Sequence, residues 1–159
     1  MPDSMSLVGD IGGTNARFAL VKNGETRLHN IEVLTGEEYP ELEGAVSAYL
    51  DKYDVTSPDS ACLAVAGPII NSQVRFTNSP WTIAKDHFQH RFKLSVFELV
   101  NDFAAQAMAV PHLDVDNPRE LRRIGPVVEG DSHAPRLVIG PGTGLGVCSL
   151  VETDGGWRA

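Results

Sequence analysis

Cysteine is scarce in this chain of 159 residues, which contains only Cys62 and Cys148. The two residues lie far apart within apolar segments, and their spacing matches neither a zinc site nor a redox-active pair. Because free cysteines are among the most buried residue types, we expect two buried structural thiols. The lack of a disulfide framework predicts a reducing compartment.

Long apolar runs are also missing, since no segment approaches the ~20 apolar residues that a membrane-spanning helix needs. The first five residues, Met1 to Met5, have neither the basic region nor the apolar centre of a signal peptide. We therefore expect a cytoplasmic protein. The hydrophobic content of 42% and the charged content of 21% are typical of a globular chain of about one ordinary domain.

Basic residues are in the minority, with 13 lysines and arginines against 21 acidic residues and a net charge of −8. This acidic balance argues against a general surface for nucleic acid or anionic membrane. The positive charge is also dispersed, because only Arg122 and Arg123 are adjacent. A bound polyphosphate would therefore need help from backbone amides and a metal ion.

The two familiar phosphate-binding motifs are absent as well: there is no G-x-x-x-x-G-K-[ST] and no G-x-G-x-x-G that leads into a helix. Instead, glycines gather in two clusters between strand-like runs, at 9–14 and 140–146. Glycine allows backbone amides to approach a ligand closely, and successive amides form concavities that bind anions. The two clusters predict a nucleotide phosphate tail held from two sides, although plain tight turns would also explain either cluster.

The hydrophobic pattern predicts an α/β protein that opens with an antiparallel meander of three strands, at 6–9, 16–22 and 27–34. Asn23-Gly24 is a strong hairpin-turn signal within it. A helix with Pro40 in its first turn should follow, because apolar residues recur at helical spacing from Leu42 to Tyr53. The apolar run 61–66 then predicts a strand covered on both faces and parallel to the sheet.

The rest of the chain continues this alternation. We expect a short strand at 74–77, a helix at 82–91, a buried strand at 95–100, a helix that ends near Ala109, a short helix near 118–123, and a final hairpin from 137–140 and 145–152.

Asp102 stands where a buried strand ends and a helix begins. Ligands of open α/β sheets gather at the carboxyl ends of the strands. A carboxylate there could act as general base toward a substrate hydroxyl, a role that contributes ~10²–10⁴ in rate. Phosphoryl transfer suits such a site, because its catalysis is mostly positioning and charge neutralisation. Alternatively, Asp102 or Asn101 simply caps the helix.

Asp10 follows the first strand and precedes a glycine pair. A carboxylate beside bound phosphate is repelled unless a cation lies between them, which makes Asp10 a candidate Mg²⁺ ligand, directly or through water. Stabilisation of an Asx turn is the alternative. The hydroxyls of Thr14 and Thr143 could donate to phosphate, or serve ordinary turn chemistry.

Thr77, Asn78 and Trp81 place short polar groups beside an indole, which suits sugar recognition, although a turn with a packed tryptophan would explain them equally. The five histidines show no metal-ligand spacing apart from a His87/His90 pair, which we interpret as solvated or packed.

Five segments in order closely resemble bacterial ATP-dependent glucokinases of the hexokinase type: 7–17, 64–69, 76–81, 100–105 and 140–146. The resemblance extends from Leu7 to Trp157. It implies the ribonuclease H-like α/β fold of actin, hexokinase and the Hsp70 ATPase, with a mixed sheet. On this basis residues 1–110 form the small domain, and residues 111–159 begin a second, incomplete domain with its first hairpin.

The resemblance also implies roles for individual residues. Asp102 would deprotonate the 6-hydroxyl of glucose, Asn101 would hold neighbouring hydroxyls, and Thr77 and Asn78 would lie near the sugar. Mg²⁺ would be held at Asp10. The residues that would bind the phosphates of ATP are Gly9, Asp10, Ile11, Gly12, Gly13 and Thr14 in the first loop, and Gly140, Gly142, Thr143 and Gly144 in the second.

One departure limits the expected activity. Members of this family are about twice as long, and after the second glycine loop they carry a Glu-Gly-Gly-His segment, a further glutamate and the adenosine pocket, none of which is present here. We therefore expect little or no turnover by the bare chain. A non-catalytic sugar-binding or regulatory module is the alternative, and a phosphatase of the same architecture is a third. Since the final hairpin leaves an exposed strand edge, we also expect a homodimer.

Overall fold

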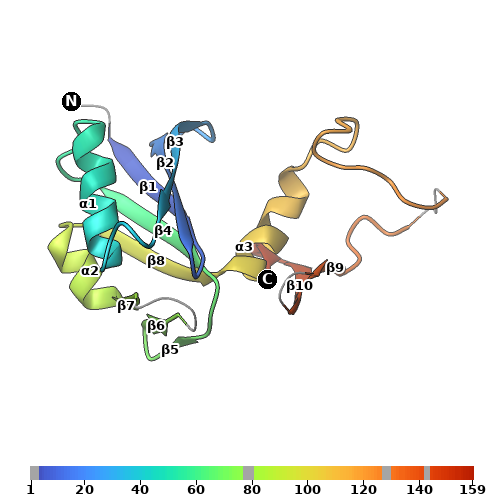
Figure 1. The fold of residues 1–159 in the computed structure, drawn as a ribbon. Helices are drawn as coiled ribbons and strands as arrows, with labels where there is room; N and C mark the ends of the chain where they lie inside the picture. Colours follow the sequence, from blue (N-terminus) through green and yellow to red (C-terminus); the bar gives the residue numbers. More distant parts are fainter. Residues whose placement is uncertain (1–3, 77–80, 127–129, 142–143) are drawn as a thin grey trace. The chain divides into compact units, whose positions relative to one another are not determined.

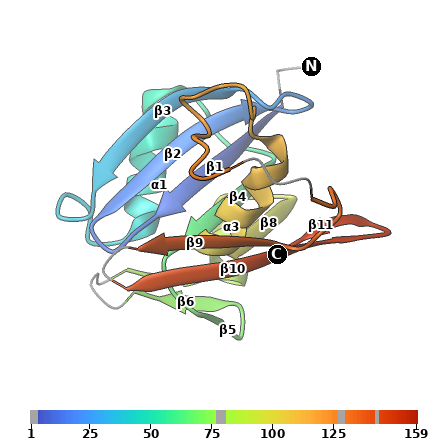
Figure 2. The ribbon, with the colours of Figure 1, turned by 90° about the vertical axis from the view of Figure 1, so that its right-hand side faces the viewer.

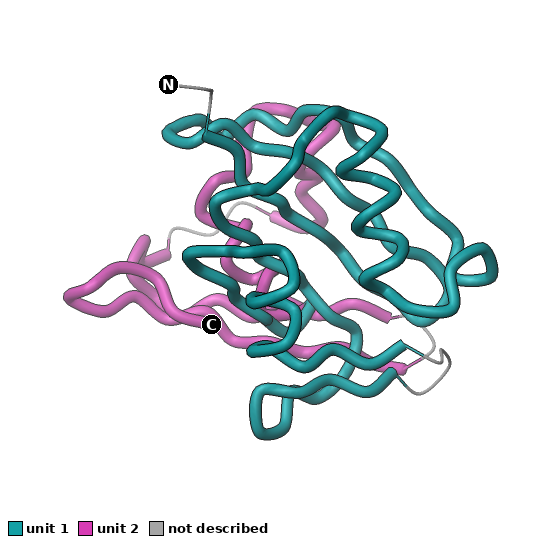
Figure 3. The backbone as a smooth tube through the Cα atoms, turned by 90° about the vertical axis from the view of Figure 1, so that its left-hand side faces the viewer, with its two compact units in different colours: residues 1–102 teal, residues 103–159 magenta. Residues whose placement is uncertain are grey.

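The computed structural model describes residues 4–76, 81–126, 130–141 and 144–159. The chain forms two compact units, residues 1–102 and residues 103–159, which Figure 3 shows in different colours. The expected domain boundary after residue 110 falls later in the chain than this division, and it stays a prediction.

The first unit is built on a mixed sheet of five strands in the order β3-β2-β1-β4-β8. The first three strands form the expected antiparallel meander, whereas β4 pairs in parallel with both β1 and β8. The bounds are β1 (Met5–Ile11), β2 (Asn15–Lys22), β3 (Leu28–Thr35), β4 (Ser60–Val65) and β8 (Val96–Asn101). Gly24, in the turn between β2 and β3, has a φ of 86°, which accounts for a glycine there.

Two helices, α1 (Leu42–Lys52) and α2 (Lys85–Arg91), cover one face of this sheet (Figure 1). Alternate strand residues such as Leu7, Phe18 and Leu63 point toward them and are buried. The ring of Phe88 on α2 stacks on that of Phe97 at 4.5 Å. The core is therefore a single layer of apolar side chains between the sheet and the two helices.

Helix α1 begins at Leu42, with Glu41 as its N-cap, so Pro40 precedes the helix rather than lying in its first turn. Helix α2 is also shorter than expected, because Thr82–Ala84 forms the strand β7. Ile83 is buried there and lies opposite Val74 of β6 (Gln73–Arg75). Pairing with a neighbouring strand thus outweighs the helical spacing at these positions. Strands β5 (Ile69–Ile70), β6 and β7 form a small sheet in that order.

The second unit contains most of α3 (Asp102–Ala109), the short 3₁₀ helix η1 (Val110–His112) and a three-stranded sheet of order β11-β10-β9. Strands β9 (Arg136–Pro141) and β10 (Leu145–Thr153) form the expected final hairpin (Figure 2), to which β11 (Gly156–Arg158) adds. The prediction of a short helix near 118–123 is wrong. Residues there form a turn in which Asn117 accepts a hydrogen bond from the Arg119 amide and donates one to Glu120, a local arrangement that competes with helix.

The expectation of two buried cysteines is also wrong, because Cys62 is exposed and Cys148 is only partly buried. In β4 the residues Ala61, Leu63 and Val65 point toward the helices, so Cys62 lies on the opposite face of the sheet. The apolar run predicted a strand covered on both faces. The exposure of Cys62 shows that this prediction is wrong for one of the two faces. Local desolvation, and then the nearby carboxylate of Glu98, raise the pKa of the Cys62 thiol. Among the described residues, no helix is long and apolar enough to cross a membrane.

A raised pKa predicts that Cys62 reacts slowly despite its exposure. In a Cys148→Ser variant, where Cys62 is the remaining thiol, its reaction with a disulfide reagent at neutral pH should be slower than in the denatured chain. The rate should still rise at pH values where that of an ordinary thiol, with a pKa of about 8.5, levels off, and Glu98→Gln should accelerate the reaction by removing the negative charge. Equal rates for the folded and denatured chains at every pH would contradict the raised pKa.

Candidate functional site

The parallel pairing of β4 with both β1 and β8 brings two predicted site segments to one edge of the sheet. Ile11 lies opposite Val65, and Val65 lies opposite Asn101. Neighbouring strands are ~4.8 Å apart, so the first glycine loop and Asn101 leave the sheet roughly 10 Å from each other. This is the carboxyl edge of the parallel strands, where ligands of such sheets bind.

The first glycine loop is a hydrogen-bonded turn with a hollow beside it. The Gly12 amide donates to the carbonyl of Asn15 at 2.9 Å, and the carbonyl of Thr14 accepts a bond from the Gly36 amide at 2.7 Å. The side-chain amide of Asn15 donates to the Thr14 hydroxyl at 3.3 Å. The hollow measures about 210 Å³ and is lined by Asp10, Gly12, Thr14, Asn15, Arg17 and Val33.

Asp10 and Arg17 are cross-strand partners whose side chains form an ion pair, with 3.2 Å between Nη1 and Oδ2. Both side chains are more than half exposed, so the pair contributes little to stability. Its importance is local, because it places a guanidinium beside the glycine loop. Arg17 was not predicted as a site residue. The signal that could have found it is its position in the second strand, directly across the hairpin from Asp10.

Asp10, which pairs with Arg17, is the one acidic residue among the described residues that line this hollow. Mg²⁺ is commonly held by one or two carboxylates together with water and substrate phosphate oxygens. Among the described residues no group of three or more histidine, cysteine or acidic side chains could form a complete metal cage. Asp10 would therefore hold the ion with water and phosphate, near the hydroxyl of Thr14.

The glycines and apolar residues of the first loop serve different purposes. A side chain at Gly9 would place its Cβ 2.7 Å from Leu63 Cδ2 and 3.1 Å from Phe18 Cδ1, so packing of the core requires glycine there. Ile11 is fully buried in the same core. A Cβ at Gly12 would meet only the Asn15 carbonyl at 3.5 Å, an ordinary contact. Gly9 and Ile11 thus pack in the core beside the loop, while Asp10, Gly12 and Thr14 line the hollow.

Asp102 is the first residue of α3 and directly follows Asn101, the last residue of β8. Asn101 is exposed and Asp102 is partly buried. This position fits both a ligand-binding residue at the carboxyl edge of the sheet and a residue that simply begins the helix.

The second glycine loop joins β9 and β10, where Gly140 and Gly146 are directly opposite each other in the ladder. A Cβ at Gly144 would meet nothing within 4 Å. The other predicted residues of this loop, Gly142 and Thr143, lie outside the described residues, as do the predicted sugar-binding residues Thr77 and Asn78.

Trp81, at the end of the predicted sugar segment, is a packed anchor. Its side chain is 1% exposed, and its indole N–H donates to the carbonyl of Tyr39 at 2.9 Å. A Cβ at Gly36 would lie 3.4 Å from the indole ring, so the residue after β3 packs closely against it. Through the bond from Gly36 to Thr14, the same tryptophan supports the first glycine loop.

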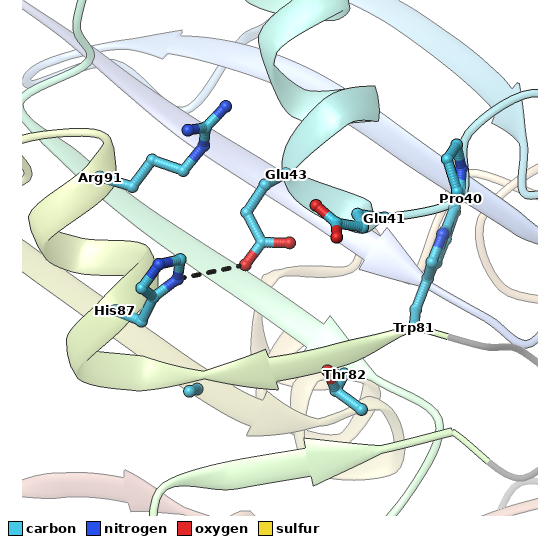
Figure 4. Close-up of a pocket in the computed structure, with 8 residues that line it drawn as sticks. Pro40, Glu41, Glu43, Trp81, Thr82, His87 and Arg91 are labelled. Atoms are coloured by element: carbon cyan, nitrogen blue, oxygen red, sulfur yellow. Dashed lines mark ion pairs between the residues drawn. The ribbon is translucent and has the colours of Figure 1, made fainter.

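A different hollow of about 430 Å³ lies near the start of α1 and α2 (Figure 4). His87 Nδ1 lies 3.7 Å from a carboxylate oxygen of Glu43 there, and the histidine side chain is 71% exposed. Of the two environments expected for His87, solvated or packed, the structure shows the solvated one. Trp81 lines the hollow, but among the residues that the structure describes none of the predicted catalytic or ligand-binding ones does.

A family model for glucokinase matches residues 7–159. The chain belongs to the glucokinase family. The glucokinases of Marinobacter nauticus and Chromohalobacter salexigens are 47% and 43% identical to it over 152 residues. Each alignment covers 96% of this chain and 46% of the relative, so this glucokinase-family chain spans about half the length of the curated relatives it matches.

Solved structures confirm the expected fold class. A glucokinase from an Antarctic psychrotroph superimposes with a TM-score of 0.84 at 35% identity, covering 98% of this chain and 48% of that one. A glucokinase from Balamuthia mandrillaris in complex with glucose gives a TM-score of 0.70 at 20% identity, which shows a shared fold alone. The α/β architecture with a mixed sheet is therefore that of the glucokinases.

Two glycine substitutions should have opposite effects on stability. Gly9→Ala inserts a methyl group into the core against Leu63, and overpacking of this kind costs about 1–3 kcal/mol. Gly44→Ala, within α1, has room because its Cβ would meet only Tyr39 at 3.9 Å, and it should stabilise by about 0.5–1 kcal/mol. Urea unfolding of the two variants beside the unmodified chain measures both effects. A neutral Gly9→Ala would contradict the packing role.

Proposed function

We propose that this chain is the N-terminal part of an enzyme that transfers the γ-phosphoryl group of Mg·ATP to the 6-hydroxyl of glucose. The observation that carries the proposal is the alignment of Ile11, Val65 and Asn101 across β1, β4 and β8. It brings the first glycine loop and Asp102 to one edge of one sheet, within a chain of the glucokinase family.

Glucose and ATP are supported as ligands by relatives of the same fold. The Balamuthia mandrillaris structure is a complex with glucose. A ROK family glucokinase from Streptomyces griseus, with a TM-score of 0.55 at 20% identity, is a complex with glucose and AMPPNP. The hollow lined by Asp10, Thr14 and Arg17 offers a guanidinium and a hydroxyl suited to phosphate oxygens.

In the proposed reaction Asp102 accepts the proton of the sugar 6-hydroxyl as its oxygen bonds to the γ-phosphorus. The bond from that phosphorus to the bridging oxygen of ADP breaks in the same transfer. Asn101, the neighbouring residue, would orient the sugar, and Thr77 and Asn78 would contact other hydroxyls. Mg²⁺, when bound with Asp10 and water, neutralises phosphate charge.

Both glycine loops would supply hydrogen-bond donors to the phosphate oxygens of ATP. Thr14 presents its hydroxyl to the first hollow, and the amides of Gly13 and Gly144 are proposed donors, together with Gly142 and Thr143. The Gly12 amide already donates a hydrogen bond within the turn, so we do not propose it as a donor to phosphate. Its lack of a side chain would instead let the ligand approach the backbone closely. A non-catalytic sugar-binding module gains no separate support from the site.

A coupled assay for glucose 6-phosphate tests the proposal. Residues 1–159 would be assayed alone and joined to the remaining C-terminal part of the Marinobacter nauticus glucokinase, each with Mg·ATP and glucose. Asp102→Asn should lower kcat by about 10²–10⁴ because it removes the base. Asp51→Asn, an exposed change of the same chemistry on α1, should leave kcat unchanged.

The controls separate two questions. Product formed by the joined protein and lost in Asp102→Asn supports the kinase and its base. No product from the joined protein, although it folds and binds glucose, would argue against phosphoryl transfer. The bare chain should show little or no turnover, and robust turnover by it would overturn the expectation that the remaining half is needed.

The homodimer is a further part of the proposal. One face of the β9–β10 hairpin exposes Leu137, Ile139, Leu145 and Val147, and β9 is an edge strand of its sheet. An exposed apolar edge of this kind favours pairing with a second chain. Sedimentation of the bare chain should show a dimer that Val147→Lys weakens, whereas a monomer at every concentration would contradict the pairing.

A further inference from the structure

Phe103, the residue after the proposed base, rests on two glycines of the β9–β10 hairpin. A Cβ placed at Gly140 would lie 2.7 Å from Phe103 Cζ and 2.9 Å from its Cε1. A Cβ at Gly146 would come closer still to the same ring. Such distances do not occur between real side chains, so the ring fills the space that side chains at both positions would take.

This packing gives a reason for two glycines that phosphate binding does not provide. Gly140 and Gly146 are opposite each other in the ladder, and together they form a flat patch that we call the ring seat. Neither has a positive φ, so backbone conformation does not require glycine there. Gly144 differs, because a Cβ on it would meet nothing within 4 Å.

We propose that Phe103 is a positioning residue for the proposed phosphoryl transfer, and that the ring seat of Gly140 and Gly146 fixes it. Asp102 and Phe103 are consecutive in the first turn of α3. A ring held against β9 and β10 therefore restrains the backbone of Asp102. The same two strands carry the second glycine loop.

The inference rests on the proposed function, and its energetic effect follows from geometry. A displacement of about 1 Å in a reacting group can cost roughly 10² in rate. Loss of the ring would leave Asp102 present but free to shift with the first turn of α3. If Phe103 only filled space, loss of its ring would lower stability without changing the position or the efficiency of the base.

The first experiment follows the backbone amide signals of Asn101 and Asp102 by NMR in the 159-residue chain. Gly146→Ala pushes the ring from its seat and should shift both signals, whereas Gly130→Ala, which has open space around it, should shift neither. Adding Phe103→Ala to Gly146→Ala removes the clash, so the two changes should be non-additive in unfolding free energy. Signals of Asn101 and Asp102 that stay in place while those of β9 and β10 move would overturn the proposal.

The second experiment uses the form that makes glucose 6-phosphate in the coupled assay. Phe103→Ala should lower kcat by roughly 10- to 10²-fold, with the KM for glucose changed less than about threefold. Phe103→Leu, which keeps apolar bulk on the seat, should recover part of the loss. An unchanged kcat, or a raised KM alone, would refute positioning. If the unmutated protein is inactive the proposed function fails, and the NMR result still decides whether the ring seat holds Asp102.

Discussion

The hydrogen-bonded ladder that joins β4 in parallel to both β1 and β8 is the constraint on which the other features depend. It forces three strands to end at one edge, and it therefore places the first glycine loop and Asp102 at the edge of the sheet where ligands of such sheets bind. The ladder in turn depends on close packing beneath it, where Gly9 leaves room for Leu63 and Phe18. The residue types that pack in the core therefore also determine where the candidate site lies.

Much of the fold follows from the sequence because its strands alternate or run apolar, and because Asn23-Gly24 marks a hairpin. The parallel placement of β4 also follows, since a helix separates it from the meander. The misjudged elements have different causes. Pairing with β6 governs Thr82–Ala84, and the side of the sheet on which it lies governs Cys62, both of which depend on the folded chain. Local side-chain hydrogen bonds of Asn117 govern the turn after it.

The candidate site divides in a similar way. Asp10, Asp102 and the two glycine clusters could be picked out in the sequence, because they directly follow or separate apolar strand-like runs. Arg17 was not assigned, since its role arises from pairing across the hairpin with Asp10. The different surroundings of Gly9, Gly140 and Gly144 could not be told from the sequence. A core contact and a ring contact exclude a side chain at the first two, whereas open space surrounds the third, yet all three are the same residue type.

The contact between Gly36 and Trp81 links segments of the chain that lie far apart in sequence. The indole fills the space beside Gly36, whose amide holds Thr14, while its own N–H holds Tyr39. A side chain at position 36 would also lie 3.2 Å from the backbone carbonyl oxygen of Thr14. In the course of evolution, any gain of bulk at position 36 would therefore press directly on the first glycine loop, whatever residue stands at position 81.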